Sequence, residues 1–439
     1  MTHPHFSRTQ LRRAVLSSYL GSVIEYYDFL LYATAAALVF NKVFFSNLDP
    51  LVGTVASFGT LATGYIARPL GGLVFGHFGD RIGRKKMLVL SMALMGVGST
   101  LIGVLPTYEQ VGVLAPILLV ALRVVQGIAV GGEWGGAVLM SAEHASSRRG
   151  LWASFTNAGA PSGVVLSTLV LAVTAALTGE EAFLAWGWRI SFLLSIVLLA
   201  IGLFVRARVE ETPVFAEAAK NKPAKPPLLE VLRHHPRNLL LSIGVGFGAF
   251  VAQGTITTFL ISYAVQAGFP RPTVLNALTL SSFVAIFGII GYSALSDRVG
   301  RKPVVIAGAI AMAVYAFALF PMVDSGSVAL LTLAIVLGQG VVHPAWYGPL
   351  AALYTELFST GSRYTGASLG YQFAGLGGGI APLVFASVLA GGGSTTTVSI
   401  IIAAGCVLCI GCILALRETA TADLTVDPGA AAAPSARRA

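Results

Sequence analysis

Charge is scarce in this sequence. Of its 439 residues, 28 are Lys or Arg and 19 are Asp or Glu, so charged residues make up 11% of the chain, against about 25% in soluble domains. So little charge cannot cover the surface of a soluble protein of this length, which excludes a soluble enzyme, a disordered chain and a nucleic-acid-binding protein. Hydrophobic residues make up 55%, and the mean hydropathy is +0.79. These values indicate a protein that crosses the membrane many times.

Cysteines and nucleotide-binding motifs are also few or absent. The three cysteines, Cys406, Cys409 and Cys412, lie at every third position of one apolar run. They offer neither a disulfide framework nor the four ligands of a metal cluster, so we interpret them as packing residues. No Walker motif occurs, which excludes an ATP-driven pump. The sequence indicates no enzyme, metal site or cofactor.

Twelve apolar runs are long enough to cross a bilayer, which takes about 20 residues of helix. Six precede the middle of the chain, namely Val15–Phe40, Thr54–Phe78, Met87–Leu105, Gly112–Met140, Leu151–Leu177 and Trp188–Val205. Six follow it, namely Asn238–Gln266, Asn276–Leu295, Val304–Met322, Ser327–Leu357, Thr365–Ala390 and Thr397–Leu416. The sequence therefore predicts an all-α integral membrane protein with twelve transmembrane helices.

Lys and Arg gather on one side of this topology. If the N-terminus is cytoplasmic, 23 of the 28 fall in cytoplasmic segments, and only Lys42, Arg189 and Arg271 fall outside. The remaining two, Arg68 and Arg123, lie within spans. Because positive residues stay inside, we expect both termini in the cytoplasm and a location in a plasma membrane of the bacterial inner-membrane type.

Two loops of the sequence repeat one another. Gly76-His-Phe-Gly-Asp80-Arg-Ile-Gly83-Arg-Lys-Lys86 follows the second run, and Ser296-Asp297-Arg-Val-Gly300-Arg-Lys302 follows the eighth, at an offset of 217 residues. A weaker echo links Glu143…Arg149 to Glu356…Arg363. The chain thus divides into two parallel six-helix repeats, which predicts a substrate site between them near the middle of the bilayer.

The repeats predict five segments. These are a cytoplasmic N-tail (1–14), a first half (15–205), a cytoplasmic linker (206–237), a second half (238–416) and a disordered tail (417–439).

The repeated loop resembles the signature of the major facilitator superfamily. Other segments resemble its metabolite:proton symporter family, namely Glu25-Tyr-Tyr-Asp28-Phe, Ala67-Arg68-Pro-Leu-Gly-Gly72, Arg123-x-x-Gln126-Gly, Gly131-Gly-Glu133-Trp, Trp186-Gly-Trp-Arg189 and Glu211-Thr-Pro-x-Phe215. A late stretch is similar to the shikimate-transporter subgroup, in Tyr347-Gly-Pro, Glu356-Leu-Phe, Arg363-Tyr-x-Gly-Ala-Ser and Tyr371-Gln372. The likeness runs from about Arg12 to Arg417. It implies the major facilitator fold and transport by alternating access, with a proton as coupling ion and no other cofactor.

Five charged residues lie within the spans, and each is expensive there unless it faces the interior of the bundle. They are Glu25, Asp28, Arg68, Arg123 and Glu133. At about 1.5 Å per residue, the first four converge on one depth. Glu25, Asp28 and Tyr32 share one face of a helix, as do Arg123, Gln126 and Glu133. Such polar stripes are typical of helices that line a cavity.

A conformation-dependent carboxyl group is what proton coupling requires. The resemblance implies that Asp28 carries the proton and that Arg123 controls it, with Glu25 or Glu133 as a second relay. The alternative is a permanent Asp28–Arg123 bridge that holds two helices together.

Two arginines at mid-depth favour an anionic substrate, because a guanidinium binds a carboxylate with two hydrogen bonds. Arg68 and Arg123 are the candidates, although Arg68 could instead neutralise Glu25 or Asp28. Hydrogen bonds and an aromatic wall could come from Tyr26, Tyr32, Gln126, Asn157, Gln253, His343, Trp346, Tyr347 and Gln372. His343 could alternatively carry a proton or make an interhelical hydrogen bond. The expected partners are this small molecule and membrane lipid, with the protein working as a monomer.

The repeated loops are candidates for a conformational latch, as the resemblance implies. The residues are Gly76, Asp80, Arg81, Gly83 and Arg84 in the first copy and Asp297, Arg298, Gly300 and Arg301 in the second. The alternative is that their positive charge serves topology alone.

The leading interpretation is a proton-coupled symporter that brings a small organic acid, shikimate-like or another carboxylate, into the cell. One alternative is a proton-coupled antiporter that exports drugs or metabolites, favoured by Gly159-Ala-Pro161-Ser-Gly163. A second is a proline or betaine symporter, although the tail lacks the heptads common in that branch. A nutrient sensor without transport is a third, and the charges within the spans disfavour it.

Overall fold

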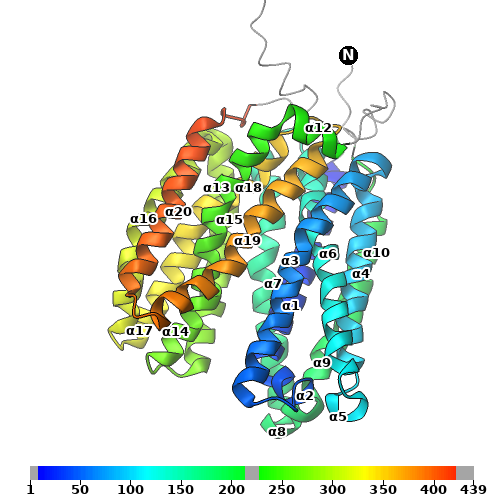
Figure 1. The fold of residues 1–439 in the computed structure, drawn as a ribbon. Helices are drawn as coiled ribbons and strands as arrows, with labels where there is room; N and C mark the ends of the chain where they lie inside the picture. The colour runs from blue at the N-terminus through cyan, green and yellow to red at the C-terminus, as the bar shows by residue number, and fades with distance from the viewer. Residues whose placement is uncertain (1–7, 213–226, 422–439) are drawn as a thin grey trace, which may run out of the picture.

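The computed structural model describes residues 8–212 and 227–421, which form a bundle of long helices (Figure 1). Ten of the helices are long and apolar enough to cross a membrane. Two more, α1 (Arg8–Ala35) and α3 (Pro50–Ile82), are as long but carry Glu25, Asp28 and Arg68. Together they make the twelve predicted spans.

The first half runs from α1 to α10. Its spans are α1, extended by a π-helical turn (Ala36–Phe40), α3, α4 (Arg84–Val104), α6 (Leu114–Glu143), α7 (Arg149–Thr178) and the segment η2 (Phe183–Gly187), α9 (Trp188–Leu193) and α10 (Ser195–Ala207). Short helices α2 (Asn41–Val43), α5 (Tyr108–Val111) and α8 (Glu180–Ala182) lie in the connections. Because α10 continues to Ala207, Arg206 belongs to this span and not to the predicted linker.

The second half follows the short helix α12 (Pro227–His234). Its spans are α13 (Pro236–Gly254) with η4 (Thr255–Phe259) and α14 (Leu260–Gln266), α15 (Arg271–Val299), α16 (Arg301–Asp324), α17 (Val328–Ile335) with η5 (Val336–Val342) and α18 (His343–Glu356), α19 (Arg363–Ala390) and α20 (Thr395–Ala415). The π-helical segment η5 directly precedes His343, and such segments often mark functional sites. Residues 213–226 of the predicted linker and 422–439 of the predicted tail lie outside the described residues.

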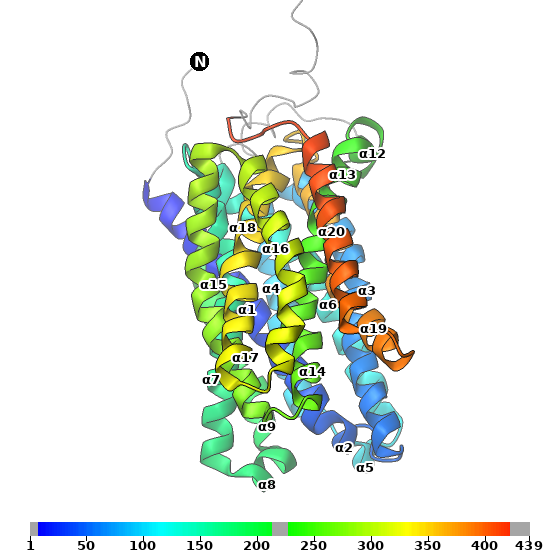
Figure 2. The ribbon, with the colours of Figure 1, turned by 90° about the vertical axis from the view of Figure 1, so that its left-hand side faces the viewer.

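The two halves stand side by side and meet at one end of the bundle. This end, which we call the tail end, holds the start of α1, the end of α20 and α12; away from it the halves diverge (Figure 1). In Figure 2, which looks onto the second half, the long helices all run between these same two ends. The halves contact through α3 with α19 and through α7 with α15, pairs that the internal repeat relates to each other. The structure confirms the predicted two-half, twelve-helix fold.

Glycines permit two features of this fold. α4 and α16 begin directly after Gly83 and Gly300, whose φ values of 115° and 101° lie in the region that favours glycine. α3 and α6 cross in backbone contact, since a Cβ on Gly131 would lie 2.8 Å from the Cα of Gly71. The lack of side chains at these glycines lets the two helices pack backbone to backbone.

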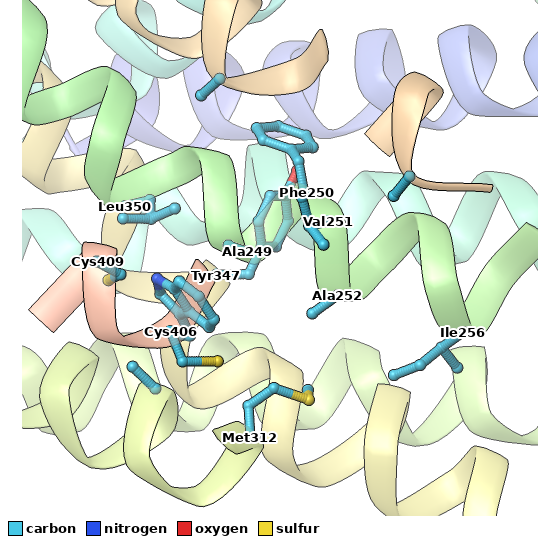
Figure 3. Packing of buried hydrophobic residues seen from close by; sticks show 14 of the residues in the cluster. Ala249, Phe250, Val251, Ala252, Ile256, Met312, Tyr347, Leu350, Cys406 and Cys409 are labelled. Atoms are coloured by element: carbon cyan, nitrogen blue, oxygen red, sulfur yellow. The ribbon is translucent and has the colours of Figure 1, made fainter. Parts of the chain in front are cut away.

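The core of the second half is apolar and aromatic (Figure 3). Cys406 and Cys409 of α20 are buried there, in the same cluster as Tyr347 of α18 and Ala249 of α13. The cysteines thus pack among hydrophobic side chains, in the role that their spacing predicts.

Candidate functional site

A small cavity of about 10 Å³, roughly the room of one water molecule, lies inside the first half. Helices α1, α3, α4 and α6 line it, with Glu25, Asp28, Phe29, Gly64, Arg68, Met95, Arg123, Gln126, Gly127 and Val130. The structure therefore brings together four of the five charged residues that the sequence places within spans. All the residues of this lining come from the first half, whereas the sequence predicts a site built by both halves.

The two carboxyl groups of the cavity are only partly satisfied. Ser195 donates a hydrogen bond of 2.7 Å to Asp28 Oδ1. Asp28 Oδ2 and Glu25 Oε2 are buried and have no hydrogen-bond partner within the described part of the chain. Asp28 and Arg123 line the same cavity, yet the described residues include no ion pair between them. Both acids are thus available to a proton.

The two arginines of the cavity rest on aromatic rings instead of on carboxylates. The guanidinium carbon of Arg123 lies 4.2 Å from the Tyr32 ring centre and 5.5 Å from that of Phe29. The guanidinium carbon of Arg68 lies 4.5 Å from the Tyr65 ring centre and 5.1 Å from that of Phe29. Ring faces attract a cation without using its N–H donors. Both guanidinium groups therefore keep donors for an anionic ligand.

Two predicted ligands support this site with hydrogen bonds. Tyr32 donates from its hydroxyl to Thr60 Oγ1 at 2.6 Å, which fixes the ring beneath Arg123. Gln126 donates to Ser99 Oγ at 2.7 Å, and its Oε1 faces no hydrogen-bond partner among the described residues. Gln126 thus retains an acceptor at the cavity.

Glu133 lies apart from the cavity, in an ion pair with Arg206. Ser91 donates a further hydrogen bond of 2.7 Å to its carboxylate, and Arg206 also donates to the carbonyl of Leu88. Both charged side chains are buried, so each needs the other. Sequence reasoning missed Arg206 because this residue ends an apolar run. The relay role of Glu133 stays a prediction.

The other predicted ligands near the junction of the halves make hydrogen bonds within the protein. Asn157 accepts from Trp134 Nε1 at 2.8 Å and donates to the Tyr347 carbonyl at 3.0 Å, while Gln372 donates to the Gly131 carbonyl at 3.2 Å. The Tyr347 and Tyr371 hydroxyls lie 2.6 Å apart. These bonds close the junction, because buried polar groups need partners wherever the halves meet.

The remaining candidates also lie outside the described cavity lining. A His343 ring nitrogen lies 3.2 Å from the Ala249 carbonyl, which is the interhelical contact weighed for it above, and Trp346 donates to the Val245 carbonyl at 3.1 Å. Gln253 and Tyr26 are half-buried on α13 and α1. Substrate contact by these residues stays a prediction.

The repeated loops hold the halves together in two contacts that the internal repeat relates to each other, and we call these contacts the clamp. The Asp80 carboxylate accepts from the backbone N–H groups of Tyr364 and Thr365 at the start of α19, at 3.1 and 2.9 Å. The Asp297 carboxylate accepts from Gly150 and Leu151 at the start of α7, both at 2.8 Å. A helix N-terminus is a natural anion site. Each half thus holds a helix end of the other.

Two buried glutamates form a second layer of this clamp. Glu143 pairs with Arg84 of its own half at 3.0 Å and with Arg363 of the other at 3.1 Å. Glu356 pairs with Arg301 at 3.1 Å and with Arg149 at 3.9 Å in the same way. In the sequence these glutamates stand out only through the weaker echo between the repeats, and that echo is the signal that could have found them.

Not every predicted latch residue takes part. Gly76 packs against α19, where a Cβ would lie 2.8 Å from the Cα of Thr365. Arg81 and Arg298 are exposed and make no hydrogen bond or ion pair with the residues described. Their side chains point away from the junction because they follow the aspartates by one position on a helix, which turns them toward solvent. Their assignment to the latch has no contact to support it.

Comparison with known proteins identifies the family. The family model for the Major Facilitator Superfamily matches residues 19–382. The chain belongs to the major facilitator superfamily. It is accordingly a multi-pass membrane transporter and not an enzyme.

Named relatives and solved structures extend this comparison. The chain is 38% identical over 420 residues to the shikimate transporter of Escherichia coli (strain K12), covering 94% of this chain and 96% of that protein. It is 32% identical over 392 residues to the proline/betaine transporter of the same strain, covering 86% and 77%. The structure of the proton:xylose symporter XylE bound to 6-bromo-6-deoxy-D-glucose matches with a TM-score of 0.76 at 20% identity, covering 94% and 97%. This last likeness shows the shared fold.

Proposed function

We propose that this transporter is a symporter that brings a small organic acid into the cell together with protons. The observation that carries the proposal is the cavity itself, in which two arginines and two carboxyl groups face one space without pairing. Arg68 and Arg123 would bind the carboxylate of the substrate. Asp28 would carry the proton, with Glu25 beside it.

Coupling would follow from the distance between Asp28 and Arg123. Burial disfavours a charged carboxylate, and a guanidinium nearby favours it. Asp28 would therefore keep a proton while Arg123 rests on Tyr32 and Phe29, as in this structure. A movement of Arg123 toward Asp28 would release the proton.

Access to the cavity would alternate between the two sides of the membrane as the clamp closes and opens. The tail end carries most of the Lys and Arg outside the spans, so we assign it to the cytoplasm and the protein to a bacterial inner membrane. With the clamp closed there and the halves diverging at the other end, this structure would correspond to the form that loads from outside (Figure 1). Opening the clamp would release substrate into the cell.

A zwitterion such as proline or betaine is the second candidate substrate. Its carboxylate would use the same arginines, and the unpaired carboxyl groups of Glu25 and Asp28 would suit its cationic nitrogen. The similarity to a proline/betaine transporter supports this candidate, and the higher identity to a shikimate transporter over more of the chain supports the acid.

Uptake into proteoliposomes tests the proposal. The panel contains labelled shikimate, quinate, protocatechuate, 2-oxoglutarate, citrate, proline and betaine, with an inside-alkaline pH gradient. We expect one acid to accumulate in the wild type, and Asp28→Asn to abolish the accumulation while leaving downhill exchange. Accumulation that survives in Asp28→Asn would exclude this proton site. Export of preloaded compounds against an acid bath, without uptake of any acid, would establish antiport instead.

A further inference from the structure

The four ionisable side chains that line the cavity carry no net charge when all of them are ionised. Arg68 and Arg123 contribute two positive charges, and Glu25 and Asp28 contribute two negative ones when ionised. Among the described residues that line the cavity, these four are the charged ones. The nearest further charges acting on Glu25 are Glu133 and Arg206, which cancel within their own ion pair. Asp28 faces Arg123, Ser99 and Ser195.

Adding one ligand alone disturbs this balance. A monocarboxylate would leave the closed cavity with a net negative charge, and a proton alone would leave it with a net positive charge. Either charge, enclosed in the membrane without a partner, costs several kcal/mol. A monocarboxylate together with one proton restores a neutral cavity. The cost of net charge thus suppresses transport when only the monocarboxylate or only the proton is bound.

We propose that the cavity moves its cargo as an electrically neutral set, with one proton for each carboxylate of the acid. Glu25 and Asp28 are the two proton sites, so a monocarboxylate travels with one proton and a dicarboxylate with two. This inference rests on the proposed symport of an organic acid and specifies its stoichiometry and substrate charge.

The membrane potential provides the test in wild-type proteoliposomes, with the panel acid that accumulates as the probe. A potassium gradient with valinomycin imposes a potential, inside negative or inside positive, while the pH gradient is varied separately. At steady state a monocarboxylate should reach about a tenfold concentration ratio per unit of pH gradient, and a dicarboxylate about a hundredfold. The ratio should not change with the potential.

Two outcomes are separated by this design. Accumulation that follows the pH gradient but also changes with the potential would overturn the neutral set and leave the symport intact. No accumulation of any acid under the pH gradient would overturn the symport and the neutral set with it. The wild-type result decides the inference without any variant.

Glu25→Gln gives a second, independent readout. The empty cavity would then carry one net positive charge, and a monocarboxylate alone would neutralise it. Uptake of a monocarboxylate should become independent of the pH gradient and be driven by an inside-positive potential. Glu109→Gln, the same change at an exposed position of α5, is the matched control and should behave as wild type. A Glu25→Gln protein with the wild-type dependence on pH and potential would contradict the proposal.

Discussion

The two halves of the molecule share a fold and a set of charged contacts at the tail end, but only the first half carries charge within the membrane. Asp80 and Asp297 hold opposite helix ends, and Glu143 and Glu356 hold opposite arginines. Inside the spans of the second half, Asp, Glu, Lys and Arg occur only at helix ends. Arg68 has Ala285 as its counterpart at the offset of the repeat.

This difference separates two tasks. The clamp must open and close between two equal partners, so both repeats keep its residues. In the proposed function the cavity would bind one substrate and its protons, so its charges would be needed in one half only. The second half then contributes apolar and aromatic surface, such as Tyr347 and Tyr371, to the closed junction.

The largest expected effect concerns the stability of the clamp. Glu143→Gln and Glu356→Gln each remove a buried carboxylate that pairs with two arginines, one from each half, and breaking a buried pair costs about 3–5 kcal/mol. We expect similar falls in the thermal stability of the purified protein in detergent for the two variants, each serving as the matched control of the other. A large fall in one variant alone would show that the contacts of Glu143 and Glu356 contribute unequally to stability.

The next effect concerns substrate binding. Arg68→Ala gives the first half the residue that the second half has at the equivalent position. Since a hydrogen bond to a charged group contributes about 1.5–3 kcal/mol, losing two should lower uptake at low substrate concentration by about 100-fold or more. Arg68→Lys keeps the charge but loses the paired donors, so its uptake rate should lie between those of the wild type and Arg68→Ala. Initial uptake rates measure both, and wild-type rates in Arg68→Ala would remove Arg68 from the site.

A smaller effect concerns the balance between clamped and unclamped forms. Asp80→Asn and Asp297→Asn each remove a charge from a helix N-terminus, a loss of about 1 kcal/mol, or about fivefold in the equilibrium. Spin labels at Arg81→Cys and Arg298→Cys, two exposed positions on opposite halves, report the distance across the tail end. Both aspartate variants should increase the long-distance population to a similar extent. An unchanged distribution would mean that these contacts do not hold the clamp.

The smallest effect is a pH dependence at the end of α20. Burial raises the pKa of Glu418, but the backbone N–H groups of Arg301, Lys302, Thr419 and Ala420 outweigh it, and the pKa is lowered overall. The contact therefore stabilises the fold at neutral pH and is lost as the pH falls below the ordinary range of a glutamate, near 4.3. Glu418→Gln should remove about 0.5–1 kcal/mol of stability at pH 7 and less at acid pH. Thermal unfolding at several pH values checks this, and an equal loss at every pH would contradict it.

Much of this architecture can be predicted from the sequence because its features are local. A run of apolar residues marks a span wherever it occurs, and a charge inside such a run stands out by itself. This is why Glu25, Asp28, Arg68 and Arg123 could be chosen, and the structure brings all four to one cavity.

The partners of buried charges could not be predicted in this way. Glu143 and Arg363 are 220 residues apart, and only the crossing of helices from opposite halves joins them. Arg206 stands at the end of an apolar run. At such a position the sequence pattern does not distinguish a cation in a loop from a cation buried in the helix. Asn157 and Gln372 look like substrate ligands in the sequence, but their amides make hydrogen bonds across the junction. Both roles require the same amide group, so the sequence cannot separate them.

The backbone contact between α3 and α6 has a consequence for substrate size. Arg68 lies on α3 and Arg123 on α6. The close glycine contact between these two helices therefore also determines how far apart the two guanidinium groups lie. Glu25 and Asp28 lie on a different helix, α1. In the proposed function, the contact between α3 and α6 would therefore set the distance between the two arginines that bind the substrate. A relative that handles a larger or smaller acid would keep Gly71 and Gly131 and change the aromatic side chains beneath the arginines, Phe29 and Tyr65.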